Sequence, residues 1–142
     1  MVNTMTIRIF LRLAMVLALA GIGTAARAQA DFGKLLAHYG QAGGRDFSAE
    51  RGKAFWQKKR AVEDGQALSC SSCHGSDAEL RESGRHYKSG KVIEPMAPTA
   101  NKDRYTDMEK LEKWFTRNCK QVVKRECSAQ EKGDVLRYLS QF

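Results

Sequence analysis

The chain has 142 residues, a length typical of one domain, and a formal net charge of +8 from 24 basic and 16 acidic residues. The basic residues form no concentrated patch with interleaved aromatics, so nucleic acid is a poor candidate partner. A moderate positive charge can instead steer an acidic protein partner toward the chain at low salt.

Residues 1–30 have the pattern of a secretory signal peptide. A positively charged start precedes an apolar run, residues 13–22, which is too short to span a bilayer comfortably. Small residues follow at the spacing that signal peptidase prefers: Ala26, Ala28 and Ala30. We therefore predict export to the periplasm and cleavage after Ala28 or Ala30, whereas a retained membrane anchor is the alternative.

Cleavage leaves a single domain, residues 31–142, with 21 basic and 16 acidic residues and hence a net charge of +5. Outside the cytosol, thiols are oxidised unless something occupies them. Cys70 and Cys73 lie close together, whereas Cys119 and Cys127 stand apart. The two pairs are therefore expected to have different fates.

Four segments have the periodicity of amphipathic helices. The first two are residues 31–40 and residues 48–60, and the second of these begins at Ser48, a good N-cap. The third and fourth begin with capping boxes at residues 106–109 and 128–131. The apolar stripes are Phe32, Leu35, Leu36 and Tyr39 in the first helix, Met108, Leu111, Trp114 and Phe115 in the third, and Val135, Leu136, Tyr138 and Leu139 in the fourth.

Residues 61–105 separate the second and third helices and are rich in Gly, Ser and charge. No strand pattern stands out, so we predict an all-α fold. A loop of this length without structure of its own is unusual in a compact domain unless it serves a function.

The strongest signal in the chain is Cys70-Ser-Ser-Cys73-His74. Two thiols three residues apart on a helical turn can each add across one vinyl group of a haem, and the adjoining histidine then points its imidazole at the iron. We predict one covalent haem c on Cys70 and Cys73, with His74 as the proximal ligand. The long loop, residues 61–105, is then expected to wrap the porphyrin, whose apolar faces replace part of the protein core.

Two other kinds of site use a Cys-x-x-Cys pair. A zinc site needs a second ligand pair at comparable spacing, and Cys119 and Cys127 are too widely separated for that. A redox dithiol is expected at the start of a helix after a strand in a βαβ unit, and the sequence predicts no such unit.

A glycine in the second helix agrees with a small c-type cytochrome. In that class the first and last helices cross closely, and a glycine lets an aromatic side chain on the last helix approach. Gly52 and Tyr138 fit such a crossing, with Trp56 one turn further along. The alternative is an ordinary helix glycine, which costs about 1 kcal/mol against alanine.

The sixth iron ligand decides the function, and the residues leave several candidates. His38 precedes the haem motif and is expected on the surface, and His86 lies in a charged loop without supporting context. Met96 stands between the haem motif and the last helix, where an electron-transfer cytochrome c usually keeps its methionine ligand. By spacing alone Met96 is the first choice, with core packing as its alternative, and Asn118 is not singled out.

Five segments carry a resemblance to a known family. They are Cys-Ser-Ser-Cys-His-Gly-Ser-Asp (70–77), Ser-Gly-Lys-Val-Ile-Glu-Pro-Met-Ala-Pro-Thr-Ala (89–100), Asp-Arg-Tyr-Thr-Asp (103–107), Glu-Lys-Trp-Phe-Thr-Arg-Asn-Cys (112–119) and Glu-Cys-Ser-Ala-Gln-Glu-Lys-Gly-Asp-Val-Leu (126–136). On these segments the chain resembles the SHP (sphaeroides haem protein) family of high-spin class I c-type cytochromes. The resemblance covers nearly all of the mature chain.

This resemblance implies a class I cytochrome c fold with long haem-wrapping loops. It also implies an asparagine as sixth ligand, directly before the first cysteine of a disulfide; here these are Asn118 and the pair Cys119 and Cys127. In the family the asparagine binds ferric iron and leaves on reduction, and the open site then takes O2, CO or NO. The electron donor that the resemblance implies is a dihaem cytochrome c.

The chain departs from the family at Met96, where the family carries leucine. A thioether beside a haem can compete with Asn118, above all for ferrous iron, because soft sulfur suits the softer ion. The leading hypothesis is a periplasmic electron-transfer cytochrome that reacts with O2 or NO, with an oxidoreductase activity toward these gases left open. The alternatives are a plain electron shuttle ligated by His74 and Met96, and a gas binder without turnover.

Overall fold

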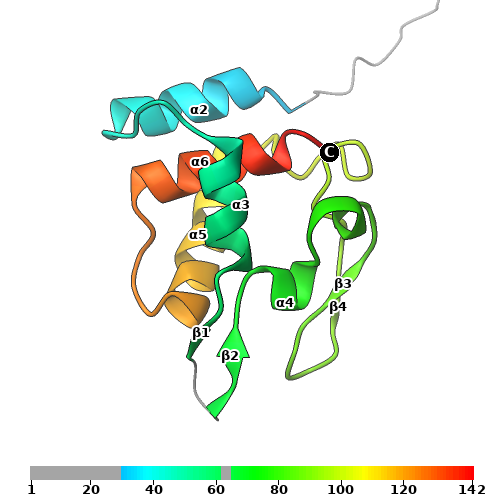
Figure 1. The fold of residues 1–142 in the computed structure, drawn as a ribbon. Helices are drawn as coiled ribbons and strands as arrows, with labels where there is room; N and C mark the ends of the chain where they lie inside the picture. The colour runs from blue at the N-terminus through cyan, green and yellow to red at the C-terminus, as the bar shows by residue number, and fades with distance from the viewer. Residues whose placement is uncertain (1–29, 62–64) are drawn as a thin grey trace, which may run out of the picture.

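The computed structural model describes residues 30–61 and 65–142, and this part of the chain is mainly helical (Figure 1). Its helices are α2 (Phe32–Gln41), α3 (Ala49–Gln57), α4 (Ser71–His74), the 3-10 helix η3 (Asp77–Arg81), α5 (Met108–Val122) and α6 (Ala129–Leu139). Helices α2, α3, α5 and α6 form the body, and residues 71–93 lie along one side of it (Figure 1). The predicted signal peptide lies outside the described residues, apart from Ala30.

Within the described residues, no helix has both the length and the apolar character that crossing a membrane requires.

Side-chain caps set two of the predicted helix starts. The Ser48 hydroxyl accepts the backbone N–H of Arg51 at 3.2 Å and begins α3. At the start of α6, Ser128 accepts the N–H of Glu131, whose carboxylate accepts the N–H of Ser128 in return. Both caps agree with the prediction from sequence.

The start of α5 differs from the predicted capping box by one residue. Asp107, not Thr106, is the N-cap, and its carboxylate accepts the backbone N–H of Lys110 at 3.0 Å. The Thr106 hydroxyl instead donates to the carbonyl of Asp103 at 2.8 Å. Threonine and aspartate are both good N-cap residues. Because the Thr106 hydroxyl is bonded within the preceding turn, Asp107 caps the helix instead.

The segment predicted as loop carries short elements of its own, within a fold that is otherwise helical, as predicted. Two antiparallel pairs of two-residue strands are present, β1 (Arg60–Ala61) with β2 (Ala67–Leu68) and β3 (Gly84–Arg85) with β4 (Val92–Ile93). Strands this short cannot show an alternating pattern in the sequence. The first strand also explains why α3 ends at Gln57 rather than at residue 60.

Helix α6 lies at the centre of the core and packs against α2 and α3. Its inward face buries Val135, Leu136, Tyr138 and Leu139, each at most 2% exposed. The rest of the buried apolar cluster comes from the other helices and from the segment between α4 and α5: Leu35, Tyr39, Trp56, Leu80, Ala97, Tyr105 and Leu111. The long segment therefore contributes to the same core.

The predicted close crossing of the second and last helices is confirmed. A Cβ atom on Gly52 would lie 2.0 Å from the carbonyl oxygen of Asp134 and 3.0 Å from Cβ of Tyr138. The buried Asp134 carboxylate also accepts the N–H of Ser48 at 2.7 Å and pairs with the Arg51 guanidinium at 2.9 Å. Contact at van der Waals distance and a buried, fully partnered carboxylate together lock α3 onto α6.

A second network joins α2, α5 and α6. The buried Tyr39 hydroxyl donates to the Glu112 carboxylate, which also pairs with the Lys132 ammonium at 2.7 Å. Burial opposes ionisation of Glu112, but the hydrogen bonds from Lys132 and Tyr39 outweigh it and hold the pKa of this carboxyl below its usual value. The charge of Glu112 is therefore matched by a neighbouring cation from the last helix.

The crossing at Gly52 can be tested by Gly52→Ala. Because the added methyl group would meet backbone rather than a flexible side chain, the helices must separate, and we expect a loss of about 1–3 kcal/mol of stability. Denaturant unfolding of the haem-loaded protein measures the loss. Gly40→Ala is the matched control, since no atom lies within 4 Å of its added Cβ, and it should gain up to about 1 kcal/mol. Equal unfolding midpoints for Gly52→Ala and the unmodified protein would contradict the tight crossing.

Candidate haem site

Helix α4 is a single turn that carries the Cys-Ser-Ser-Cys-His motif. The carbonyl of Cys70 accepts the backbone N–H groups of Cys73 and His74 at 3.3 and 3.2 Å. The hydroxyl of Ser72 accepts the N–H of Ser69 at 3.0 Å and stabilises the entry to the turn. Cys70 and Cys73 therefore lie one turn apart on one side of the helix, and neither is in a disulfide.

Burial raises the pKa of the Cys70 thiol to about 11, although the charge of Arg60 opposes this shift. A redox-active Cys-x-x-Cys pair normally has a nucleophilic cysteine with a lowered pKa. A buried thiol that stays protonated does not fit a redox dithiol, and it suits a cysteine that is consumed by a thioether bond.

His74 lies in an apolar setting beside Trp56, with 5.5 Å between the ring centroids. Burial, with a contribution from the charge of Arg104, lowers the pKa of His74 to about 4, so the imidazole is neutral at ordinary pH. Its Nδ1 atom is buried and has no hydrogen-bond partner in the part of the chain that the structure describes. A neutral, buried and incompletely hydrogen-bonded imidazole fits an iron ligand, because metals bind the neutral ring.

Two aromatic side chains of the helical body hold the segment that carries His74. The indole N–H of Trp56 donates to the carbonyl of Gly75 at 2.8 Å. The Tyr138 hydroxyl accepts the backbone N–H of Asp77 at 2.9 Å and donates to its carboxylate at 3.1 Å. The haem motif is thus fixed on its C-terminal side by α3 and α6 at once.

The hairpin of β3 and β4 approaches the motif from the other side. A Cβ atom on Gly84 would lie 2.0 Å from the carbonyl oxygen of Cys73, so only glycine fits there. At the far end of the hairpin, Nε2 of His86 lies 3.3 Å from the side-chain nitrogen of Gln121 on α5. The hairpin therefore bridges the haem motif and the end of α5.

Asn118 lies near the end of α5 and is half-buried. No hydrogen bond of its side-chain amide is present among the described residues. The next residue, Cys119, is buried and forms a disulfide with Cys127, with a Cα–Cα distance of 5.7 Å. Cys127 immediately precedes the N-cap of α6, Ser128. The disulfide thus ties the backbone that carries Asn118 to the central helix.

Met96 lies in the chain between η3 and α5, and its sulfur is already in contact with another side chain. The Arg104 Nε atom donates to the Met96 sulfur at 3.1 Å. The Met96 backbone N–H donates to the carbonyl of Leu80 at 2.9 Å, and its own carbonyl accepts the Tyr105 hydroxyl at 2.5 Å. Sequence reasoning missed this contact of Arg104, although Arg104 stands within one of the segments that carry the family resemblance.

His38 and His86 are the two other histidines that the sequence offered as candidate ligands. His38 is exposed on α2, as expected. His86 is engaged within its hairpin, where its Nδ1 lies 3.2 Å from the Ser89 hydroxyl, and it contacts Gln121 through Nε2. Through Gln121, which lies one helical turn after Asn118, His86 contacts the same end of α5 that carries Asn118.

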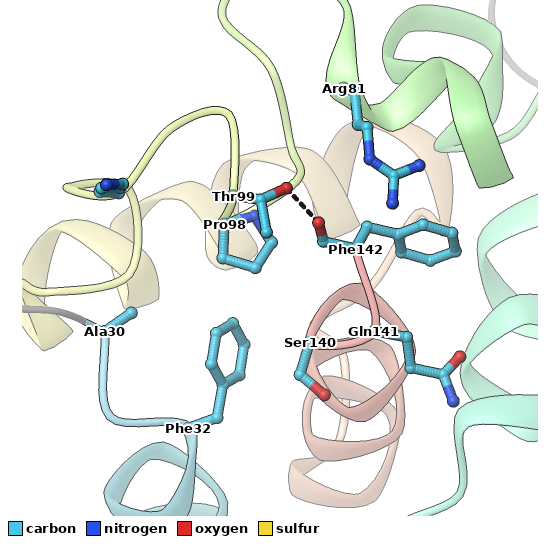
Figure 2. A pocket seen from close by; sticks show the side chains of 9 residues that line it. Ala30, Phe32, Arg81, Pro98, Thr99, Ser140, Gln141 and Phe142 are labelled. Carbon is cyan, nitrogen blue, oxygen red and sulfur yellow. Dashed lines mark hydrogen bonds between the residues drawn. The ribbon is translucent and has the colours of Figure 1, made fainter.

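A surface hollow of about 460 Å³ lies elsewhere, between the start of α2, the end of α6 and the chain around Pro98 (Figure 2). The Thr99 hydroxyl donates to the carbonyl of Phe142 across one wall of this hollow (Figure 2). None of the predicted haem or iron ligands lines it: its residues are Ala30, Phe32, Arg81, Pro98, Thr99, Lys102, Ser140, Gln141 and Phe142. It is separate from the haem site.

The helical body and the Cys-x-x-Cys-His turn define a class I c-type cytochrome. A family described as a domain of unknown function, DUF1924, matches residues 42–139. The cytochrome c-type protein SHP of Cereibacter sphaeroides is 39% identical over 107 residues, which are 75% of this chain and 81% of SHP. The structure of oxidised SHP, described as an oxygen binding cytochrome c, superposes with a TM-score of 0.71 at 36% identity, over 81% of this chain and all of that one. The chain belongs to the SHP family and is a mono-haem cytochrome that carries haem c.

Cytochrome c'' of Methylophilus methylotrophus is a further relative, 35% identical over 88 residues, which are 62% of this chain and 60% of cytochrome c''. The crystal structure of its oxidised form has a TM-score of 0.69 at 30% identity, over 77% of this chain and 92% of that one. Its solution structure, described with the structural basis of haem-ligand detachment, has a TM-score of 0.65 at 31% identity.

The predicted thioether bonds are tested by replacing both motif cysteines. Made with the c-haem maturation machinery, the unmodified protein should carry one haem that survives acid–acetone extraction, on a chain that begins near Gln29 or Asp31. Cys70→Ala with Cys73→Ala should leave extractable haem or none, because both vinyl attachments are lost. Intact-mass measurement of the two proteins decides. Haem that stays covalently bound to the double variant would contradict the assignment.

The disulfide beside Asn118 is expected to stabilise the fold. Cys119→Ser with Cys127→Ser opens a short loop, which costs about 2.5 kcal/mol by the chain-entropy model. Denaturant unfolding measures the loss, and mass spectrometry under non-reducing conditions checks the bond in the unmodified protein. Finding both thiols free there would remove the tether.

Proposed function

We propose that this cytochrome works in the periplasm and that its reduced form reacts with O2 or NO at an iron site from which Asn118 has been released. The haem supplies a one-electron Fe(III)/Fe(II) couple and a sixth coordination position. The chain contributes His74 as the permanent ligand and Asn118 as the ligand that leaves. Cys70 and Cys73 hold the group covalently.

The observation that carries this proposal is the state of the Asn118 side chain. It is half-buried on α5 and, within the described residues, without a hydrogen-bond partner. The amide is therefore not held by another group of the protein, and its oxygen is available to bind a metal. A neutral amide oxygen is a hard, weak donor that binds Fe(III) better than Fe(II), so reduction itself favours its release.

The disulfide would keep Asn118 close to the iron after the side chain has been released. Cys119 is 5% exposed and is bonded to Cys127 at the start of α6. The backbone at Asn118 is therefore anchored one residue away from the ligand. We infer that only the side chain and the end of α5 move when Asn118 leaves the iron, and that reoxidation brings the amide back.

The engaged sulfur of Met96 speaks against the plain electron shuttle. That alternative needs the Met96 sulfur to face the iron, whereas Arg104 donates a hydrogen bond to it at 3.1 Å and so holds it toward the guanidinium. The descriptions of two relatives support the proposal, since SHP is described as an oxygen binding cytochrome c and cytochrome c'' with haem-ligand detachment.

The net charge of the mature domain indicates the kind of electron donor, and the predicted signal peptide indicates the cellular location. The mature domain carries 21 basic and 16 acidic residues, which favours an acidic surface on the electron donor. In line with the family resemblance, we propose a dihaem cytochrome c as this donor. The predicted signal peptide would bring this chain to the periplasm, where its electron donor would have to be present as well.

The role of Asn118 is tested by ligand binding to Asn118→Ala. The ferric variant should bind azide at least about tenfold more tightly than the unmodified protein, because no internal ligand competes. The ferrous unmodified protein should already be five-coordinate, so its CO association rate should rise linearly with CO concentration. Stopped-flow absorbance measures both. Gln121→Ala, an amide one turn along the same helix, is the control and should change neither.

A different result would favour the electron shuttle. In that case the ferrous protein is low-spin, and the CO association rate reaches a plateau set by the slow release of Met96. Met96→Leu would then remove the plateau, and Asn118→Ala would leave both measurements unchanged.

A further inference from the structure

Arg104 binds the segment that carries Met96 through two atoms of one guanidinium. Its Nε donates to the Met96 sulfur at 3.1 Å, and its Nη2 donates to the Glu94 carbonyl at 3.2 Å. The Asn101 amide donates to the Glu94 carboxylate at 3.1 Å, which ties the same segment to the chain just before Arg104. A fork that spans side chain and backbone fixes the direction of the thioether and does more than fill space.

The backbone of Met96 is fixed on both sides as well. Its N–H donates to the carbonyl of the fully buried Leu80 at 2.9 Å, and its carbonyl accepts the hydroxyl of Tyr105, which is 2% exposed. The Met96 backbone is therefore held in place and cannot shift to carry the sulfur to a new position. A new position of the sulfur requires rotation of the Met96 side chain away from Arg104.

Arg104 brings a positive charge into contact with the Met96 sulfur. A guanidinium stays protonated at every relevant pH. A thioether that accepts a hydrogen bond from a cation is a poorer electron-pair donor to a metal. The Met96 sulfur therefore binds the iron well only after it leaves Arg104.

We propose that Arg104 is a positioning residue that withholds the Met96 sulfur from the iron and so keeps the sixth position for Asn118 and for diatomic gases. This inference rests on the proposed function and names the residue that determines the choice of ligand. Arg104 acts through Met96 and does not itself touch the reacting atoms. A soft thioether would otherwise be the stronger ligand for ferrous iron.

The test compares the spectra of the holoprotein with those of Arg104→Leu. The ferric variant should become low-spin and gain the weak far-red sulfur-to-iron charge-transfer band. Its ferrous form should bind CO at least about tenfold less tightly, because Met96 then fills the site in about nine-tenths of the molecules or more. Adding Met96→Leu to this variant should abolish the band and restore the affinity for CO.

Two further variants keep the experiment decisive. Arg104→Gln is read in the same way if Arg104→Leu fails to load haem, because a neutral amide lacks the charge that holds the sulfur. Arg137→Leu makes the same change at an exposed arginine of α6 and should leave every spectrum unchanged.

The outcomes separate this inference from the proposed function. A high-spin spectrum without the sulfur band in Arg104→Leu and Arg104→Gln, with unchanged affinity for CO, overturns the role of Arg104 alone. A sulfur band in the unmodified ferric protein overturns the proposed function, and the inference falls with it.

Discussion

The crossing of α3 over α6 at Gly52 is the constraint on which the haem site depends. It brings the two helices to backbone contact, and each then presents one aromatic side chain to the segment after the Cys-x-x-Cys-His turn. Trp56 from α3 holds the carbonyl of Gly75, and Tyr138 from α6 holds Asp77. The segment that carries His74, the proposed proximal ligand, is therefore positioned by two helices whose separation is set by the missing Cβ of Gly52. A side chain at that one position would separate the anchors of the haem motif as well as the helices.

Helix α6 is the reference for the other side of the site too. The disulfide joins the residue after Asn118 to the residue before Ser128, the N-cap of α6. Lys132 of the same helix pairs with Glu112 on α5, so α5 is held at two points along its length. A ligand that has to leave and return gains from such a tether, because rebinding is intramolecular and occurs at a high effective concentration. In the proposed mechanism, α6 thus helps to fix His74 and limits the movement of Asn118.

The sequence predicts best the features whose chemistry is local. Two thioether bonds and a proximal histidine require their residues within one turn, and caps such as Ser48 act over three residues, so both are legible as spacing. The two hairpins could not be predicted from the sequence, because two-residue strands show no periodicity. The contact between Arg104 and Met96 could not be predicted either, because it joins side chains across an irregular segment that has no periodic pattern. Asn118 carries no spacing signal at all, and only the resemblance to a family singled it out before its free amide was seen on α5.

The choice between asparagine and methionine at this iron is a matter of a few kcal/mol. A hydrogen bond from a charged donor contributes about 1.5–3 kcal/mol, and a thioether is a weak acceptor, which places the contact of Arg104 with Met96 near the lower end. About 1.4 kcal/mol biases the population of two states tenfold, so this bond alone would leave a sizeable fraction of Met96 free to bind. The backbone bonds of Met96 to Leu80 and Tyr105 each contribute about 1 kcal/mol against a shift of the residue as a whole, which leaves rotation of the side chain as the movement that Arg104 opposes. If Met96 is held in this way, as we propose, a strong ligand for ferrous iron is kept out of competition, and a weak one such as Asn118 suffices for the ferric state.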